Sequence, residues 1–368
     1  MSKISVAVVG CGALAQVMHL PYLQRLDQFE LVAVCDLSAK LACETAKRFH
    51  IPEWVTDYRQ LITPQIQGIL VLTGGSHGEI CLEFAKAGKH IFVEKPLCYS
   101  PQEARALQEV ANTEGICVVI GYMKRFDPGY RYAQQLLTDP QDVRYLQVTV
   151  LHPRESHYLK HQQIVRADDI SRKTIETWVS NSRRLAKDAI GDVDDGVLDF
   201  YTNVLLGSLI HDINATRHLV GEPDRVLSAN VWAKRQAVSV DLQFSNGIVG
   251  HYSWCYFDDA NAYSEKIGVY SEGQRITLDF PSPYLQHAPT PVTVENSDAD
   301  AMSTCHVVVN YEEAFEQELL HFHACVSKKA LSLTPIEDGL QDILVLKAVA
   351  QTIISGTPQS ILDQGSER

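Results

Sequence analysis

The chain lacks any long hydrophobic run, and it carries neither an internal repeat nor a low-complexity tract. A helix needs about 20 apolar residues to cross a bilayer, and no signal-peptide pattern precedes the first predicted strand. We therefore expect no membrane segment and a cytoplasmic location. Basic residues are also scarce, since 32 Lys and Arg stand against 45 Asp and Glu, for a formal net charge of −13. Nucleic acids and anionic membranes bind basic faces, so the charge excludes both as partners.

The sequence also lacks a recognisable disulfide framework or metal motif. Its nine cysteines are odd in number, widely dispersed and placed mostly in apolar segments. This usage is typical of free thiols in a reducing compartment. His321 and His323 do not have the i, i+4 spacing with which two histidines on a helix bind one metal. We predict no metal site.

Strands and helices alternate in the first third of the 368 residues. The predicted strands are continuously apolar, as expected for a parallel sheet covered on both faces. This pattern predicts an α/β fold with a doubly wound parallel sheet of the Rossmann type in residues 1–122. Strands are expected at 4–9, 31–36, 68–73, 90–94 and 117–121, and helices at 13–27, 38–48, 77–87 and 101–114.

The first predicted strand ends in a glycine-rich turn that opens a helix, and the second ends at an acid, Asp36. Gly10 permits the tight turn, and Gly12 lets the backbone approach a pyrophosphate at the helix N-terminus. Ala15 keeps the helix close to the sheet. The Asp36 carboxylate can accept hydrogen bonds from ribose hydroxyls and would repel a 2′-phosphate, which favours NAD over NADP. The residues of this unit predicted to bind the cofactor are Gly10, Gly12, Ala13, Leu14, Ala15 and Asp36.

Residues 123–368 show a different pattern, which predicts an α+β domain with a large, mostly antiparallel open sheet. Alternating strands flank two turn signals, Asn246-Gly247 and Glu272-Gly273, and helices are expected near 204–219, 311–328 and 337–355. The stretch 152–200 is charged and poorly periodic. It is either a lid or specificity loop over a cleft, or an oligomer contact.

Three further motifs follow the glycine-rich turn in a fixed order: Thr73-Gly-Gly-Ser-His77, Glu94-Lys95-Pro96 and the segment Gly121–Pro128. This order resembles the Gfo/Idh/MocA family of NAD(P)-dependent oxidoreductases, and the resemblance covers almost the whole chain. Lys95 follows a strand at the carboxyl end of the sheet, where such folds bind ligands, and its ammonium can polarise a substrate oxygen. His77 either lines the nicotinamide pocket or caps the next helix, and Arg125 either contacts a ligand or pairs with Asp127. With these motifs the cofactor-binding set gains Thr73, His77, Glu94, Lys95 and Arg125.

The resemblance also implies an Asp and a His four residues later as the catalytic pair of the second domain. His211 falls on the histidine of that pair, where imidazole suits proton exchange with an alcohol or ketone. Gly207 stands at the position of the acid. The chain thus departs from the family pattern at one of its two catalytic positions.

Together these features predict an NAD-dependent oxidoreductase that acts on an alcohol or ketone of a sugar, cyclitol or sugar derivative. Lys95 would polarise the oxygen and His211 would exchange the proton. The departure at Gly207 keeps two alternatives open. One is a non-catalytic dinucleotide-binding sensor or regulator, and the other is a reductase of a bulkier non-sugar substrate.

The second domain also predicts a homodimer or homotetramer. Helices are expected on one face of its sheet only, and we expect Trp232, Tyr252 and Trp254 to supply aromatic groups to the other face. An exposed apolar face of that extent is typical of a self-association surface.

Overall fold

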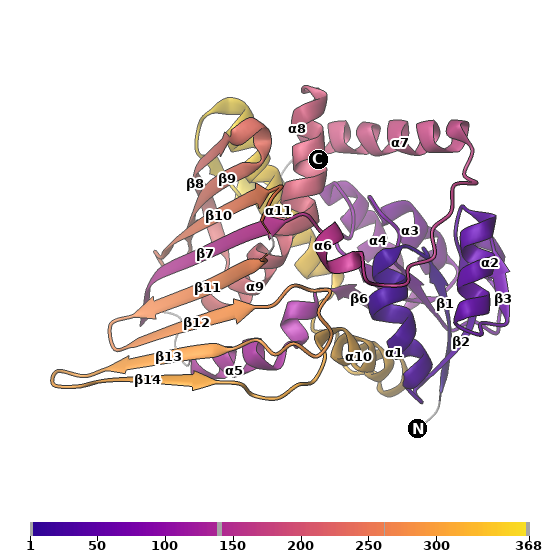
Figure 1. The fold of residues 1–368 in the computed structure, drawn as a ribbon. Helices are drawn as coiled ribbons and strands as arrows, with labels where there is room; N and C mark the ends of the chain where they lie inside the picture. The colour runs from indigo at the N-terminus through magenta and orange to yellow at the C-terminus, as the bar shows by residue number, and fades with distance from the viewer. Residues whose placement is uncertain (1–2, 138–141, 261, 366–368) are drawn as a thin grey trace. The chain divides into compact units, whose positions relative to one another are not determined.

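The computed structural model describes residues 3–137, 142–260 and 262–365, and its ribbon is drawn in Figure 1. The chain divides into two compact units. The first comprises Met1–Met123, Leu159–Leu198 and Phe315–Gln341, and the second comprises Lys124–Tyr158, Asp199–Ala314 and Asp342–Arg368. The first unit therefore takes in two segments beyond the predicted 1–122 domain. No helix within the described ranges is both long and apolar enough to span a bilayer.

The first unit contains a six-stranded sheet in the order β3-β2-β1-β4-β5-β6, with every neighbouring pair parallel. The predicted doubly wound sheet is confirmed. The order reverses beside β1, so the carboxyl ends of β1 and β4 flank a crevice of the kind that binds nucleotides. The strands are β1 (Ile4–Val9), β2 (Phe29–Cys35), β3 (Glu53–Val55), β4 (Gly68–Val71), β5 (His90–Glu94) and β6 (Val118–Gly121).

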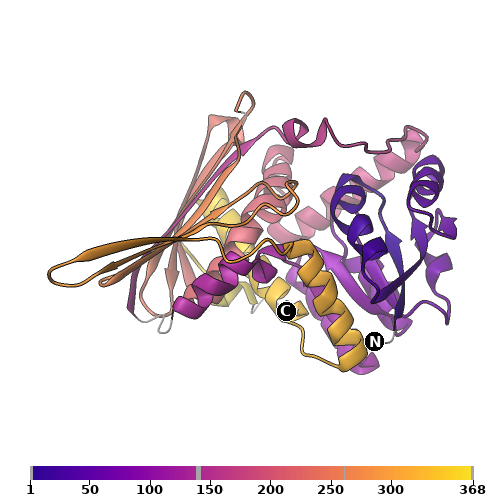
Figure 2. The ribbon, with the colours of Figure 1, turned by 60° about the horizontal axis from the view of Figure 1, so that its bottom comes forward.

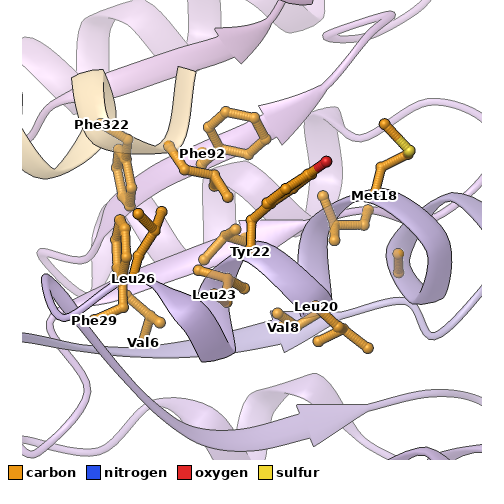
Figure 3. Close-up of a cluster of buried hydrophobic side chains, with 14 of the residues drawn as sticks. Val6, Val8, Met18, Leu20, Tyr22, Leu23, Leu26, Phe29, Phe92 and Phe322 are labelled. Atoms are coloured by element: carbon orange, nitrogen blue, oxygen red, sulfur yellow. The ribbon is translucent and has the colours of Figure 1, made fainter. Parts of the chain in front are cut away.

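The helices of this unit include one from the late segment of the chain. Figure 3 shows Phe322 of this helix, α10, with Phe29, Tyr22 and Val6 in one hydrophobic cluster. Burying these side chains fixes the helix next to the glycine-rich turn against the sheet. The helices are α1 (Leu20–Arg25), α2 (Ala39–Arg48), α3 (Gly78–Lys86), α4 (Pro101–Glu114), α7 (Arg172–Ile190) and α10 (Ala314–Lys328), and a π-helical turn, Ala15–His19, precedes α1.

Helix α7 corrects the sequence analysis, which treated residues 152–200 as poorly periodic. The helix has 19 residues. Ser171 caps its N-terminus by accepting a hydrogen bond from the Thr174 N–H at 3.1 Å. A regular helix of this length presents one continuous face to the rest of the unit, which a loop would not.

The second unit contains a nine-stranded sheet in the order β14-β13-β12-β11-β7-β10-β9-β8-β15. The pair β7–β10 is parallel and the other neighbours are antiparallel, which confirms the mostly antiparallel sheet. The strands are β7 (Val143–Pro153), β8 (Pro223–Trp232), β9 (Ala237–Phe244), β10 (Val249–Phe257), β11 (Ser264–Ser271), β12 (Gln274–Phe280), β13 (Val292–Ser297), β14 (Met302–Val307) and β15 (Gln359–Ser360).

The helices of the second unit lie on one face of this sheet, as Figure 2 shows. The predicted aromatic outer surface is wrong for two of its three residues. Tyr252 and Trp254 lie on the helix-covered face, where they are 1% and 5% exposed, while Trp232 is 47% exposed. Each buried ring places its polar atom against a helix-side hydroxyl, Tyr252 on Thr216 at 2.7 Å and Trp254 on Ser208 at 2.9 Å. The helices that begin and end in this unit are α5 (Pro128–Leu136) and α9 (Ile210–Val220), and a π-helical segment, Tyr201–Leu209, leads into α9. The remaining helices, α6 (Ser156–Leu159), α8 (Asp195–Phe200) and α11 (Ile336–Ser355), each begin in one unit and end in the other.

Candidate functional site

A cavity of about 550 Å³ opens at the carboxyl ends of β1, β2 and β4 in the first unit. Its volume and its place at the point where the strand order reverses are those of a cofactor site. Four of the predicted cofactor-binding residues line it, and a second group comes from the segment that includes α7. The lining includes Gly10, Gly12, Asp36, Thr73, Gly75, Ile170, Ile175, Trp178, Asn181 and Ser182.

The two glycines of the turn have different environments. Gly10 has φ +101°, and a Cβ built on it would lie 2.7 Å from the backbone carbon of Leu72. A Cβ on Gly12 would meet nothing within 4 Å. Gly10 therefore lets the turn pack against the end of β4, whereas Gly12 leaves open space at the cavity wall for a ligand to approach the backbone.

Asp36 ties the glycine-rich turn to the end of β2. Its Oδ2 accepts the Cys11 N–H and its Oδ1 accepts the Ser38 N–H, both at 2.9 Å. A carboxylate offers about four acceptor positions, so these bonds leave capacity for a ribose hydroxyl at the cavity. Burial, followed by the charge of Asp36, raises the pKa of the Cys11 thiol, which keeps its sulfur neutral beside the carboxylate.

Two side chains, those of His77 and Glu103, form hydrogen bonds that support the loop after β4. His77 is 1% exposed, and its Nδ1 and Nε2 lie 2.6 Å and 2.7 Å from the carbonyl oxygens of Pro96 and Thr73. Burial lowers the pKa of His77, while the two carbonyls oppose this because they favour a ring with two N–H donors. Glu103 accepts the Ser76 hydroxyl at 2.7 Å. His77 thus supports the Thr73 wall of the cavity, and its side chain makes no hydrogen bond as the cap of α3.

Lys95 follows β5 and is half-buried. Glu94 before it is buried, its Oε1 pairs with the Nε2 of His19 at 2.7 Å, and its Oε2 accepts the Lys95 N–H at 3.2 Å. A Cβ on Gly121 would lie 3.1 Å from Glu94, so glycine at that position leaves room for the carboxylate. These contacts fix the backbone at the point where Lys95 leaves the sheet. Glu94 acts here as a positioning residue.

One group of buried side chains in the first unit has the spacing of metal ligands. One ligand atom of each residue, taken from His19, Glu94 and Glu318, lies within 4.8 Å of the others. Among the described residues, this is the one group of three or more His, Cys, Asp or Glu side chains whose ligand atoms lie that close together. The 2.7 Å separation of His19 and Glu94 is that of a hydrogen bond, which accounts for their approach without an ion.

His211 lies at the start of α9 in the second unit and is half-buried. Asp212 beside it is 1% exposed, and its Oδ1 lies 3.8 Å from the ammonium of Lys124, which also pairs with Glu265. Burial raises the pKa of Asp212, and Lys124 opposes that rise. Sequence reasoning missed this ion cluster, because its members, Lys124, Asp212 and Glu265, come from three segments that are far apart in the sequence.

Two other residues of the second unit bear on the predicted site. Asn214, three residues after His211 on α9, is 1% exposed and donates to Asp342 at 2.8 Å. A Cβ on Gly207 would lie 3.3 Å from the Thr202 carbonyl oxygen. Arg125 also belongs to this unit and is half-buried, so its contact with a cofactor stays a prediction.

Residues of α7 line part of the cavity, within the segment predicted to be either a lid or specificity loop over a cleft or an oligomer contact. Sequence reasoning missed the helix and these individual residues. Ile175, Trp178 and Ser182 follow one another at helical spacing of three and four, which is the signal that could have identified the helix and its inward face. Trp178 lies against Gly75, where a built Cβ would be 3.4 Å from the indole. The indole is still 50% exposed.

Comparison with known proteins gives matches over both units. Residues 4–122 match the model described as "Oxidoreductase family, NAD-binding Rossmann fold", and residues 200–361 match "Oxidoreductase family, C-terminal alpha/beta domain". The uncharacterized oxidoreductase YrbE of Bacillus subtilis (strain 168) is 22% identical over 98% of this chain and 97% of its own length.

Two further similarities name a substrate. The scyllo-inositol 2-dehydrogenase (NAD(+)) of the same organism is 33% identical over 135 residues, which cover 36% of this chain and 40% of that protein. The structure of levoglucosan dehydrogenase with NADH and levoglucosan superposes with a TM-score of 0.75 at 18% identity, and covers 98% of this chain and all of that one. At that identity, the structural likeness establishes the fold alone.

Proposed function

Because the chain belongs to the Gfo/Idh/MocA family of oxidoreductases, we propose that it transfers hydride between NAD and an alcohol or ketone carbon of a sugar or cyclitol. Oxidoreductase activity with a nicotinamide cofactor comes with the family. The choice of NAD, the substrate class and the catalytic residues are our inference. The observation that carries it is the cavity in which Gly12 faces open space and Asp36 stands at the end of β2.

The cavity fits a dinucleotide. Backbone N–H groups at the start of the helix after Gly12 can bind a pyrophosphate, and Asp36 can accept the ribose hydroxyls. The same carboxylate would repel a 2′-phosphate, which supports NAD as the preferred cofactor. The bound nicotinamide would supply or accept the hydride.

Lys95 and His211 are the residues to which we assign the chemistry. An ammonium at the carboxyl end of β5 favours negative charge that develops on a substrate oxygen. An imidazole exchanges a proton near neutral pH. The name of the inositol dehydrogenase relative supports a cyclitol or sugar as the substrate. Nine free cysteines support a reducing, cytoplasmic location.

The test combines binding with turnover. NADH and NADPH are titrated by fluorescence, and NAD reduction is then followed with a panel of sugars and cyclitols, with ketosugars assayed in reverse. We expect tighter binding of NADH and turnover of at least one compound. Lys95→Ala should lower kcat by about 10²-fold with NADH binding retained, and His211→Ala should lower it by about 10²–10⁴-fold.

Matched controls come from the same elements. Lys86→Ala removes a lysine exposed on α3, and His218→Ala removes a histidine from the same helix as His211. Both should leave kcat within about twofold of the parent, because Lys86 is exposed and His218 lies about two helical turns from His211, and neither is assigned a role in the chemistry. Full activity of Lys95→Ala would contradict the proposed mechanism.

Gly207 supports a second candidate, a dinucleotide-binding sensor without turnover. Glycine at this position removes the carboxylate that the family pairs with its histidine. A chain that binds NADH and turns over no compound, including bulky unsaturated rings, would favour the sensor.

A further inference from the structure

Residues 159–170, which we call the strap, run from α6 to α7 within the first unit. The strap is bonded to the glycine-rich turn through Gln16, which is 3% exposed. The Gln16 Nε2 donates to the Val165 carbonyl at 3.0 Å and to the Cys11 carbonyl at 2.8 Å, and its Oε1 accepts the Val165 N–H at 2.8 Å. One buried amide thus holds the strap to the segment that faces the cavity.

A second anchor lies at the other end of the strap. Asp169 accepts the hydroxyl of Ser38, and its Oδ2 accepts the Lys40 N–H at 2.9 Å. Ser38 is also bonded to Asp36, through its own N–H. The next residue of the strap, Ile170, lines the cavity together with Asp36. Two carboxylates from distant parts of the chain, Asp36 and Asp169, are therefore both bonded to Ser38.

The groups that bind Asp169 are those that would bind a phosphate. A hydroxyl and a backbone N–H in the first turn of a helix are standard phosphate donors, and the Lys40 ammonium adds a positive charge. Hydrogen bonds from Ser38, and then from the Lys40 N–H, lower the pKa of Asp169, so its carboxylate is ionised at neutral pH. The strap thus places its own anion on donors adjacent to Asp36.

We propose that Asp169 is a second specificity-determining residue, which excludes NADP by occupying the donors that a 2′-phosphate would need. The inference rests on the proposed use of NAD in this cavity. Asp36 accounts for repulsion at the ribose, while Asp169 removes the attraction that Ser38 and Lys40 would otherwise supply. Discrimination against NADP therefore depends partly on the strap, which is far from the glycine-rich turn in the sequence.

The test is fluorescence titration of NADH and NADPH with the full chain and with Asp169→Asn. The substitution removes the charge at nearly constant size. We expect the Kd of NADPH to fall by about tenfold, because a 2′-phosphate displaces a neutral amide from these donors more easily than it displaces a carboxylate, while the Kd of NADH stays within about twofold. Adding Ser38→Ala to Asp169→Asn should reverse most of the gain.

Asp168→Asn is the matched control. Asp168 precedes Asp169 in the strap, is 94% exposed, and lies 3.6 Å from the Lys40 ammonium, so its substitution changes the net charge equally. We expect it to change the Kd of NADPH by less than about threefold, because the Ser38 hydroxyl and the Lys40 N–H bond to Asp169 and not to Asp168.

Three results would overturn the inference. They are an unchanged Kd for NADPH in Asp169→Asn, an equal gain in Asp168→Asn, and an equal gain for both cofactors, which would mean that Asp169 only keeps the strap closed. Each of these leaves the proposed function intact when the parent binds NADH. If neither cofactor binds to the parent or to the variant, the proposed function fails and the inference fails with it.

Discussion

Gly10→Ala should lower the stability of the fold, whereas Gly12→Ala should lower the affinity for NADH, although the two residues are only two positions apart. At Gly10 a side chain must adopt φ +101°, which costs about 1–3 kcal/mol for a non-glycine residue. Its Cβ would also lie 2.7–2.8 Å from backbone atoms of Leu72 and Thr73, which cannot rotate away. Such overpacking adds about 1–3 kcal/mol. Gly10→Ala should therefore destabilise the first unit by about 2–6 kcal/mol.

Gly12→Ala should leave the fold intact. Gly12 does not have a positive φ, and its Cβ would enter open space. The methyl group would instead occupy the place where a pyrophosphate approaches the backbone, and loss of a hydrogen bond to a charged group costs about 1.5–3 kcal/mol. We expect NADH affinity to fall by at least about tenfold with little change in stability.

Thermal unfolding and NADH titration of the three proteins decide the matter. At about 2–4 °C per kcal/mol, Gly10→Ala should lower Tm by about 4–24 °C, while Gly12→Ala should stay within about 2 °C. A Gly10→Ala chain as stable as the parent would refute the argument from φ and backbone contact. A Gly12→Ala chain that binds NADH like the parent would show that no pyrophosphate lies at this wall of the cavity.

Three further predictions follow from other parts of the molecule. Burial lowers the pKa of His77, so the unfolded chain binds more protons than the folded chain below about pH 6.5. The free energy of unfolding, measured with urea, should therefore fall from about pH 7.5 to about pH 5.5, and it should fall less in His77→Gln than in the parent. Gly207→Asp places a carboxylate one helical turn before His211 and should move the acid limb of the pH–rate profile upward, and an unmoved limb would mean that the two side chains do not interact. We also propose a homodimer or homotetramer assembled through the sheet face that carries the rings of Tyr145 and Tyr270, and light scattering that gives a monomer at micromolar concentration would rule it out.

The first unit was largely predictable because its signals are local. Continuous apolar runs ending in glycine or an acid predict buried parallel strands and the turn between them, and β1 and β5 begin and end where expected. The short strand β3 was not predicted, since its Glu53 and Trp54 are exposed and leave no apolar run to detect. A three-residue edge strand depends on its neighbour β2 for its hydrogen bonds, and sequence periodicity does not record that.

In the second unit, the sequence analysis placed two aromatic residues on the wrong face of the sheet. Strand alternation correctly places Tyr252 and Trp254 on one face, but alternation alone does not say which face the helices cover. Tyrosine and tryptophan rings tolerate burial when their polar atom finds a partner, and here Thr216 and Ser208 supply it. An aromatic residue on a half-covered sheet is therefore weak evidence for an outer surface.

The groups that anchor the strap are joined by contacts between residues that are far apart in the sequence. Asp169 reaches Ser38 across 131 positions, and Val165 reaches Gln16 across 149. Asp169 and Val165 lie in a segment whose sequence resembles a solvent-exposed loop, because a segment held by side-chain hydrogen bonds needs no apolar periodicity. In the sequence, Ser38 can be identified only as a possible helix cap, and Gln16 only as a polar residue of the first predicted helix. Sequence reasoning thus finds a cofactor site where its residues are clustered along the chain. It describes residues 152–200 only as a lid or specificity loop or an oligomer contact, and it does not identify the side-chain contacts that bind the strap to Ser38 and Gln16.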